Sequence, residues 1–237
     1  MKNLRTAFLG MGLAFLFASC EKVVGEGPVV TENRTKGEFS GIDLRVSGNV
    51  YYTQSPEYKI EVSAQQNILD VLETYVSNNK LVIKYENDVR VRRHEDITVN
   101  ISAPDLNSLR VSGSGNISTT GMLKPNSMDM DVSGSGNINV ANITTNYIEA
   151  NISGSGNIKV QNGTAAEEKL KISGSGNLDL MNVAAKTATT TTSGSGDTKV
   201  KVSERLNVTI SGSGSVYYIG QPAINTSISG SGKVRQL

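Results

Sequence analysis

Hydrophobic and polar residues alternate through the second half of the chain, in short runs separated by one recurring motif. The motif is Ser-Gly-Ser-Gly followed by asparagine in its first four copies and by another residue in the last three. The copies are Ser112–Asn116, Ser133–Asn137, Ser153–Asn157, Ser173–Asn177, Ser193–Asp197, Ser211–Ser215 and Ser229–Lys233. They begin 21, 20, 20, 20, 18 and 18 residues apart. A repeat of this length with strand-like alternation inside each unit indicates a β-solenoid.

We therefore predict an all-β fold, a single-stranded right-handed parallel β-helix of about seven coils of ~20 residues over residues 108–237. Side chains alternate along a strand, so Ile152 and Ile158, which flank one motif, both point inward. The motif glycines share this parity, and we expect the strand to run regularly through them. In the alternative, the glycines form a corner and the parity slips by one residue.

One coil has an unusually polar set of inward positions. Ala188, Thr190, Thr192 and Thr198 occupy the parity that carries valine, isoleucine or leucine in other coils. Buried hydroxyls need hydrogen-bond partners. We predict that this coil opens first.

The preceding region, residues 36–107, lacks the full motif but contains several alternating runs, so we expect a β-rich cap over the first coil. Within it, Gln65–Val76 is the one helix candidate, with Asn67 as N-cap. The cap is thus predicted to be strands with one short helix.

The N-terminus has the pattern of a targeting segment. Residues 1–19 combine Lys2 and Arg5 with a short apolar stretch and read as a lipoprotein signal peptide. They lead into Ala18-Ser19-Cys20, which resembles a bacterial lipobox, so Cys20 is the predicted lipidation site. The alternative is a general secretory signal cut near Ala18. Residues 20–35 would form a flexible tether, and the partner at this end would be a membrane.

Composition narrows the function classes. The 237-residue chain has a net charge of +1, and this balance argues against a nucleic-acid partner. There is one cysteine and one histidine, His94, so neither a cysteine pair nor a His/Cys cluster is available, and we expect no metal and no cofactor. Arg90, Arg92 and Arg93 form a small basic cluster that suits lipid head groups, an acidic partner or a solvated edge.

With the repeat, the cap and the lipobox established, the chain resembles a bacterial family named putative auto-transporter adhesin, head GIN domain. The similarity covers residues 36 to 235. It rests on Phe39-Ser40-Gly41-Ile42, on Val46-Ser47-Gly48-Asn49-Val50, on the lead-in Ile97–Leu106 and on the recurrent motif. The resemblance implies a secreted or lipid-anchored envelope protein with a parallel β-helical fold, and it supplies no catalytic residues.

Stacked coils would align the polar residues of the motif into ladders. We take these as the candidate ligand-binding surface, for a glycan or for an envelope or host protein. Its members are Ser114, Asn116, Ser135, Asn137, Ser155, Asn157, Ser175, Asn177 and Asp197. The alternative is structural, because asparagine ladders also stabilise stacked strands. The sequence leaves the oligomeric state open.

The expected protein is a non-enzymatic, adhesin-like or scaffolding lipoprotein of the bacterial envelope, most simply at the outer membrane. The alternative function is a carbohydrate-active enzyme, a polysaccharide lyase or hydrolase of the β-helix type. That chemistry needs two carboxylates at a defined separation. The candidates are Asp129, Asp131, Asp179 and Asp197, and we expect them to be surface residues without a catalytic role.

Overall fold

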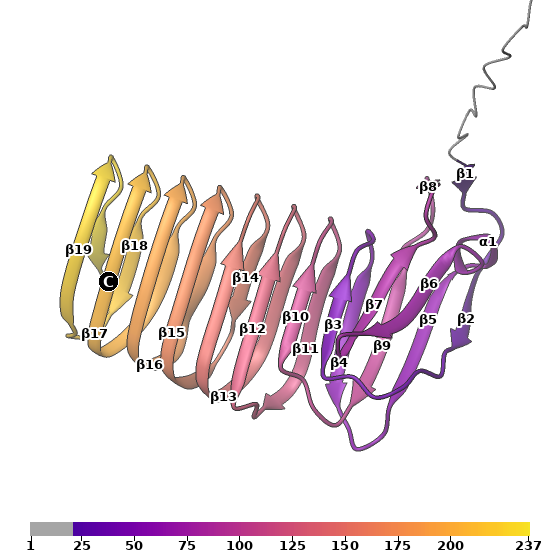
Figure 1. The fold of residues 1–237 in the computed structure, drawn as a ribbon, viewed down its shortest axis with the longest axis horizontal. Helices are drawn as coiled ribbons and strands as arrows, with labels where there is room; N and C mark the ends of the chain where they lie inside the picture. The colour runs from indigo at the N-terminus through magenta and orange to yellow at the C-terminus, as the bar shows by residue number, and fades with distance from the viewer. Residues whose placement is uncertain (1–20) are drawn as a thin grey trace, which may run out of the picture.

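The structure is a computed structural model that describes residues 21–237, and it confirms the predicted right-handed β-solenoid with a β-rich cap at its N-terminal end (Figure 1). Each coil contains one strand that leads into the motif and one strand that returns from it. The strands of successive coils pair in parallel and in register. In the described part of the chain, the seven motif corners mark out about six complete turns, close to the predicted seven coils.

Two sheets face each other across the interior. The leading sheet, whose strands precede the motif, contains β7 (Lys80–Tyr85), β3 (Gly41–Leu44), β10 (Ser108–Val111), β12 (Ser127–Val132), β15 (Gly163–Gly174), β19 (Ala223–Gly230) and the second halves of β13 (Asn137–Ile152), β16 (Leu178–Gly194) and β17 (Thr198–Gly212). The returning sheet contains β9 (Thr98–Ala103), β4 (Asn49–Gln54), β11 (Asn116–Leu123), β14 (Asn157–Val160), β18 (Val216–Ile219), β20 (Val234–Gln236) and the first halves of β13, β16 and β17. Long strands therefore pass from one sheet to the other at the corner opposite the motif.

The motif itself is a corner, so the prediction of a regular strand through it was wrong. Gly134 has φ 152°, a backbone region that only glycine adopts readily, and a Cβ on it would lie 2.5 Å from the Gly113 carbonyl oxygen. Instead, that carbonyl accepts hydrogen bonds from the backbone N–H groups of Ser135 and Gly136. The parity nevertheless does not slip, because Val111 and Ile117 are buried on either side of one motif.

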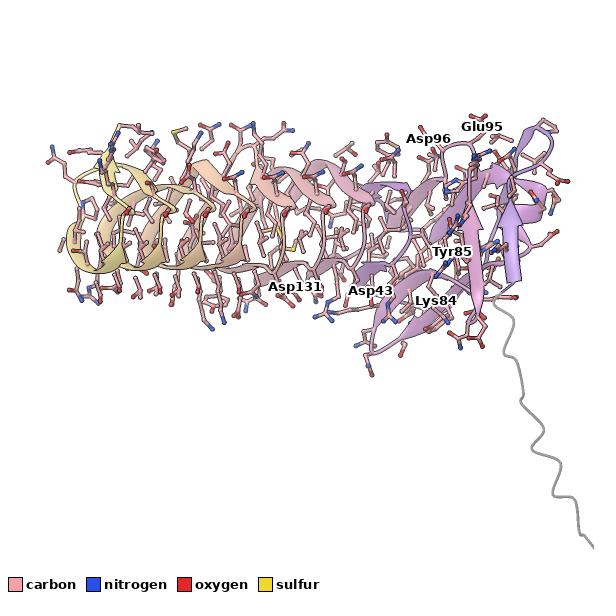
Figure 2. The ribbon with its side chains drawn as sticks, turned by 90° about the horizontal axis from the view of Figure 1, so that it is seen from above. Asp43, Lys84, Tyr85, Glu95, Asp96 and Asp131 are labelled. Atoms are coloured by element: carbon pink, nitrogen blue, oxygen red, sulfur yellow. The ribbon has the colours of Figure 1, made fainter. Side chains whose placement is uncertain are left out.

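Aliphatic columns fill the interior between the sheets (Figure 2). One column runs through Ile117, Ile138, Ile158 and Leu178, which are in register on successive coils and are at most 1% exposed. Burial of each such side chain contributes about 1.5–3 kcal/mol. Because each side chain in the column packs against those of the coils on either side, contacts between neighbouring coils supply most of the stability of the solenoid.

The cap adds strands outside the solenoid. β2 (Val29–Asn33) and β5 (Lys59–Gln65) extend the returning sheet, and both of their pairings are antiparallel. β6 (Leu72–Ser77) pairs antiparallel with β7. The coil made by β3 and β4 lies between the coil of β7 and β9 and the coil of β10 and β11, so spatial order departs from chain order here.

Two expectations for the cap need correction. The helix α1 spans only Gln66–Leu69, with Gln65 rather than Asn67 at the N-cap, and Leu72–Ser77 is a strand. Pairing with β7 supplies backbone partners there, and Tyr75 and Val76 favour strands. The expected flexible tether also contains two strands, because β1 (Glu21–Val24) pairs in parallel with β8 (Val89–Arg92) and β2 joins the cap.

None of the helices in residues 21–237 has the length and apolar character needed to cross a membrane.

Candidate functional site

An asparagine ladder runs along the motif corners, where the returning strands begin. Asn116 Nδ2 donates to Asn49 Oδ1 at 2.9 Å, and Asn137 Nδ2 donates to Asn116 Oδ1 at 2.8 Å. Asn157 and Asn177 continue the pattern, each donating to the preceding side-chain oxygen at 2.9 and 3.0 Å. Asn49 was not predicted as the first member, although it stands in the degenerate copy of the motif, Ser47-Gly48-Asn49.

Backbone amides complete the ladder in its later coils. Asn177 N–H donates to Asn157 Oδ1 at 3.1 Å, Asp197 N–H donates to Asn177 Oδ1 at 3.0 Å, and Ser215 N–H donates to Asp197 Oδ1 at 2.8 Å. Each of these asparagine oxygens thus accepts from the next coil. What the amide ladder offers to a ligand is mainly the second N–H of each side chain.

The serines of the predicted surface lie beside this ladder. Ser114, Ser135, Ser155 and Ser175 are exposed, and their hydroxyls make no side-chain hydrogen bond within residues 21–237. They form a row of free hydroxyls at the spacing of stacked strands, about 4.8 Å. The structure therefore brings the predicted ladder residues together in two adjacent rows. In one row the asparagine amides bond to one another, and in the other the serine hydroxyls face water.

A shallow groove of about 380 Å³ opens beside the ladder over β14 and the first halves of β16 and β17. Its lining combines Asn157, Asn177 and Asp197 with Lys159, Asp179 and Lys199. Lys159 Nζ lies 3.9 Å from Asp179 Oδ2, an exposed pair that contributes little to stability. The groove carries both charges and amides, which suits a polar ligand.

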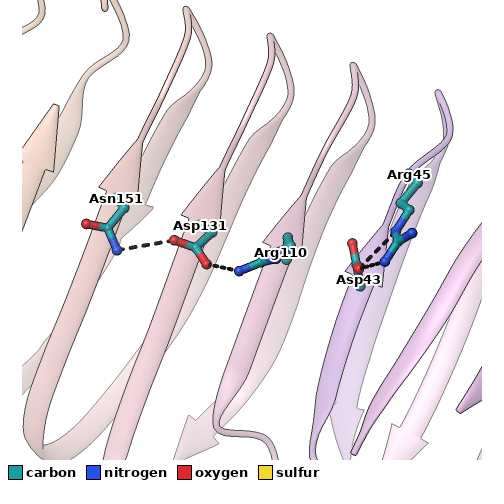
Figure 3. Close-up of polar contacts among 5 residues, drawn as sticks. All are labelled: Asp43, Arg45, Arg110, Asp131 and Asn151. Atoms are coloured by element: carbon teal, nitrogen blue, oxygen red, sulfur yellow. Dashed lines mark hydrogen bonds and ion pairs between the residues drawn. The ribbon is translucent and has the colours of Figure 1, made fainter. Parts of the chain in front are cut away.

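A second polar network lies on the outer face of the leading sheet (Figure 3). Arg110 Nη2 donates to Asp131 Oδ2 at 2.7 Å, and Asn151 Nδ2 donates to Asp131 Oδ1 at 3.2 Å. Asp43 is 3% exposed, and its Oδ2 accepts from Arg45 Nη2 at 2.7 Å. Asp43 and Asp131 lie along the same outer face (Figure 2).

The aspartates considered for catalysis do not converge. Asp129 and Asp131 project from β12 in the leading sheet, whereas Asp179 and Asp197 belong to the side of the returning sheet. Burial, and then the charge of Asp131, raises the pKa of Asp129 above its ordinary value. Among residues 21–237, no group of three His, Cys, Asp or Glu side chains is placed to hold a metal ion.

The remaining candidates lie near the cap. Arg90 and Arg92 are exposed on β8, Arg93 follows it with φ 47°, and His94 Nδ1 lies 2.6 Å from the Glu95 carbonyl oxygen. Cys20, the predicted lipidation site, lies outside the described residues.

One polar residue in the interior escaped the sequence analysis. Glu168 on β15 is fully buried, and neither carboxyl oxygen has a hydrogen-bond partner. Its neighbours in register are Ile148 and Ala188, and burial raises the pKa of Glu168 well above its ordinary value. The signal was present, since Glu168 has the same parity as Leu170 and Ile172.

These features define a class of protein: capped parallel β-solenoids whose glycine corners are joined by an asparagine ladder. The chain belongs to the family described as putative auto-transporter adhesin, head GIN domain, which it matches over residues 38–222. The family predicted from the sequence motifs is thereby confirmed.

Solved structures of similar proteins share the fold. A putative adhesin from Bacteroides fragilis is 26% identical, with a TM-score of 0.84 over 91% of this chain and 100% of that one. A putative lipid binding protein from Parabacteroides distasonis is 24% identical, with a TM-score of 0.77 over 92% and 100%. A putative adhesin from Parabacteroides merdae is 22% identical, with a TM-score of 0.74 over 92% and 99%. No curated protein matches the chain.

Proposed function

We propose that this protein is an adhesin-like lipoprotein of the bacterial cell envelope that binds a glycan or protein partner without catalysing a reaction. Membership of the adhesin family and the fold shared with the Bacteroides fragilis protein support this role. Lipid attachment at Cys20 and placement at the outer membrane are parts of the proposal.

The position of β1 is the observation that carries it. Glu21, the residue after Cys20, begins β1, which is paired with β8 at the cap end of the molecule. The solenoid extends from the cap to β19 at the far end (Figure 1). An acyl anchor on Cys20 would therefore hold the cap near the membrane and direct the solenoid coils away from it, as an adhesin requires.

Labelling of the protein in cells tests the anchor. Wild-type protein should incorporate radiolabelled palmitate and fractionate with membranes, whereas Cys20→Ser should lose the label. Added protease should cleave the wild-type protein on intact cells if the solenoid faces outward. Incorporation of label by Cys20→Ser would refute lipidation at this residue.

Binding is tested separately, with glycan arrays and pull-downs that use residues 21–237. A variant with Asn137, Asn157 and Asn177 changed to alanine shows whether the ladder contributes. The non-enzymatic role predicts no turnover on a broad panel of acidic polysaccharides. Turnover that disappears in Asp131→Asn would instead establish the enzyme.

A further inference from the structure

A pocket lies where the cap meets the solenoid, at the corner opposite the motif. Residues 104–107 connect β9 to β10, residues 124–126 connect β11 to β12, and a cavity of about 440 Å³ opens between the two connections. We call it the seam pocket. Its polar lining includes Ser40, Gln54, Asp105, Asn107, Lys124 and Asn126.

The floor of the seam pocket is apolar. Leu106 and Leu123 line it and are 3% and 1% exposed, so their side chains belong to the core. The volume of the seam pocket lies within the 300–1,000 Å³ typical of small-ligand sites, and its polar side chains can fix the orientation of a ligand.

Hydrogen bonds hold the walls in place. Asn107 N–H donates to the Ser40 carbonyl at 2.8 Å, and the Asn107 carbonyl accepts from Asp129 N–H at 2.9 Å. Gln54 Nε2 donates to the Pro104 carbonyl at 2.7 Å. The pocket is therefore preformed, and a ligand would not need to order these segments on binding.

The chemistry of the rim suits hydroxyl groups. The side chains of Asp105, Asn107 and Lys124 make no hydrogen bond or ion pair within residues 21–237, so they are available to a ligand. The carboxylate and the ammonium balance each other in charge. The amides offer donors and acceptors together, as the hydroxyl groups of a sugar do.

An aromatic pair includes the residue that precedes Ser40 of this rim. Phe39, which precedes Ser40, packs edge-to-face with Tyr58 at a centroid distance of 5.3 Å. Tyr58 is 39% exposed. Aromatic side chains combine an apolar face with a polar tip, which matches the mixed surface of a pyranose ring.

We infer that the seam pocket binds one residue of a neutral saccharide, with Asp105, Asn107 and Lys124 contacting its hydroxyl groups. The inference rests on the proposed glycan-binding role and assigns it to the seam pocket rather than to the asparagine ladder. The ladder amides bond to one another, whereas the side chains of Asp105, Asn107 and Lys124 make no hydrogen bond within residues 21–237.

Nuclear magnetic resonance titration of ¹⁵N-labelled protein tests the inference. Residues 21–237 suffice, since they contain the whole described core. The probes are the methyl glycosides of glucose, galactose and mannose, N-acetylglucosamine, and glucuronic acid as an acidic arm. At least one neutral sugar should shift the amide resonances of residues 105–107, 123–124 and 126–127 with a saturable dependence on concentration.

Paired variants separate the seam pocket from other surfaces. Asp105→Ala with Asn107→Ala should weaken binding of that sugar at least tenfold, because the double variant removes two of the three side chains inferred to contact its hydroxyl groups. The control, Asp96→Ala with Asn100→Ala, removes the same groups from exposed positions outside the pocket and should bind as wild type. Melting temperatures of both variants verify the fold.

Three results would overturn the inference. Shifts confined to Asn157 and Asn177 would place binding at the ladder and leave the proposed function intact. Preference for glucuronic acid would identify an acidic ligand. Absence of shifts with every sugar would remove the saccharide site, while pull-down of a protein partner would still support the adhesin-like role.

Discussion

Polar side chains in two regions of the solenoid differ in whether stacking of the coils gives them hydrogen-bond partners. At the motif corners, asparagine oxygens accept one or two hydrogen bonds from the next coil. In the interior, the carboxyl oxygens of Glu168 and the hydroxyls of Thr190 and Thr192 are buried without partners. Stacking satisfies polar side chains that lie at a corner, but it isolates those that lie in an aliphatic column.

The interior polar residues fall on neighbouring coils. Glu168 is in register with Ala188, and Thr190 and Thr192 lie on the same strand as Ala188. Thr198, on the returning strand that follows, is also buried. These residues interrupt columns that are otherwise aliphatic, as the parity of the sequence predicts for Ala188–Thr198.

Replacing Glu168 with leucine should have the largest effect. The change removes an unpaired buried carboxyl group and fills the same column with hydrocarbon, so the free energy of unfolding at pH 7 should rise by about 2–4 kcal/mol. Denaturant titration measures it. The same substitution at exposed Glu167 is the control and should change stability little. A loss of stability in Glu168→Leu would show that the carboxyl group has a partner in solution.

Stability should also depend on pH through Glu168. The pKa of Glu168 is raised in the folded state, so protonation of this carboxyl group stabilises the fold. That stabilisation is complete below the unfolded pKa, about 4.3, and is lost as pH rises toward the folded pKa. The unfolding free energy of the wild type, minus that of Glu168→Gln, should fall by up to about 1.4 kcal/mol per pH unit in that window. Denaturant titrations from pH 4 to 9 measure this slope, and a constant difference would contradict the burial of an ionisable group.

Thr190→Val and Thr192→Val should each raise the unfolding free energy by about 1 kcal/mol, because valine keeps the shape and removes an unpaired hydroxyl. Hydrogen exchange adds a local readout. Amides of Ala188–Thr198 should exchange faster than those of Tyr147–Val160 in the wild type and slow down in the double variant. Thr189→Val, at an exposed position on the same strand, is the matched control.

A smaller effect than that of the two threonine variants together is expected at the ladder. Asn157→Ala removes a side chain that links Asn137 to Asn177 and should lower the unfolding free energy by about 1 kcal/mol. Asn225→Ala, at an exposed position with no side-chain hydrogen bond in the described chain, should be neutral. Equal stability of both variants would mean that the ladder does not stabilise the stack.

The repeat made the solenoid predictable, because inward parity agrees on both sides of each motif and identifies Ile152, Ile158 and Thr190 as interior residues. The corner geometry was harder to predict. The corner requires glycine because the backbone has a positive φ there and lies in close contact with the preceding coil. A hydrophobic pattern reveals neither the backbone angle nor this contact. The predicted helix was too long because Leu72–Ser77 takes its strand conformation from pairing with β7, which is a tertiary contact.

The candidate site was predictable only in part. The ladder follows from the period, whereas the seam pocket depends on where the chain crosses from β9 to β10. That crossing brings together Gln54, Asp105 and Lys124, which are far apart in sequence. Glu168 could have been found by extending the parity of Leu170 by two residues.

The placement of β4 between β9 and β11 has a consequence for biosynthesis. Residues 49–54 emerge early, yet both of their neighbours, Thr98–Ala103 and Asn116–Leu123, come later in the chain. Vectorial folding from the N-terminus therefore cannot complete this part of the sheet until residue 123 has emerged. Nucleation should wait for these long-range contacts, after which later coils can add one at a time onto a finished template.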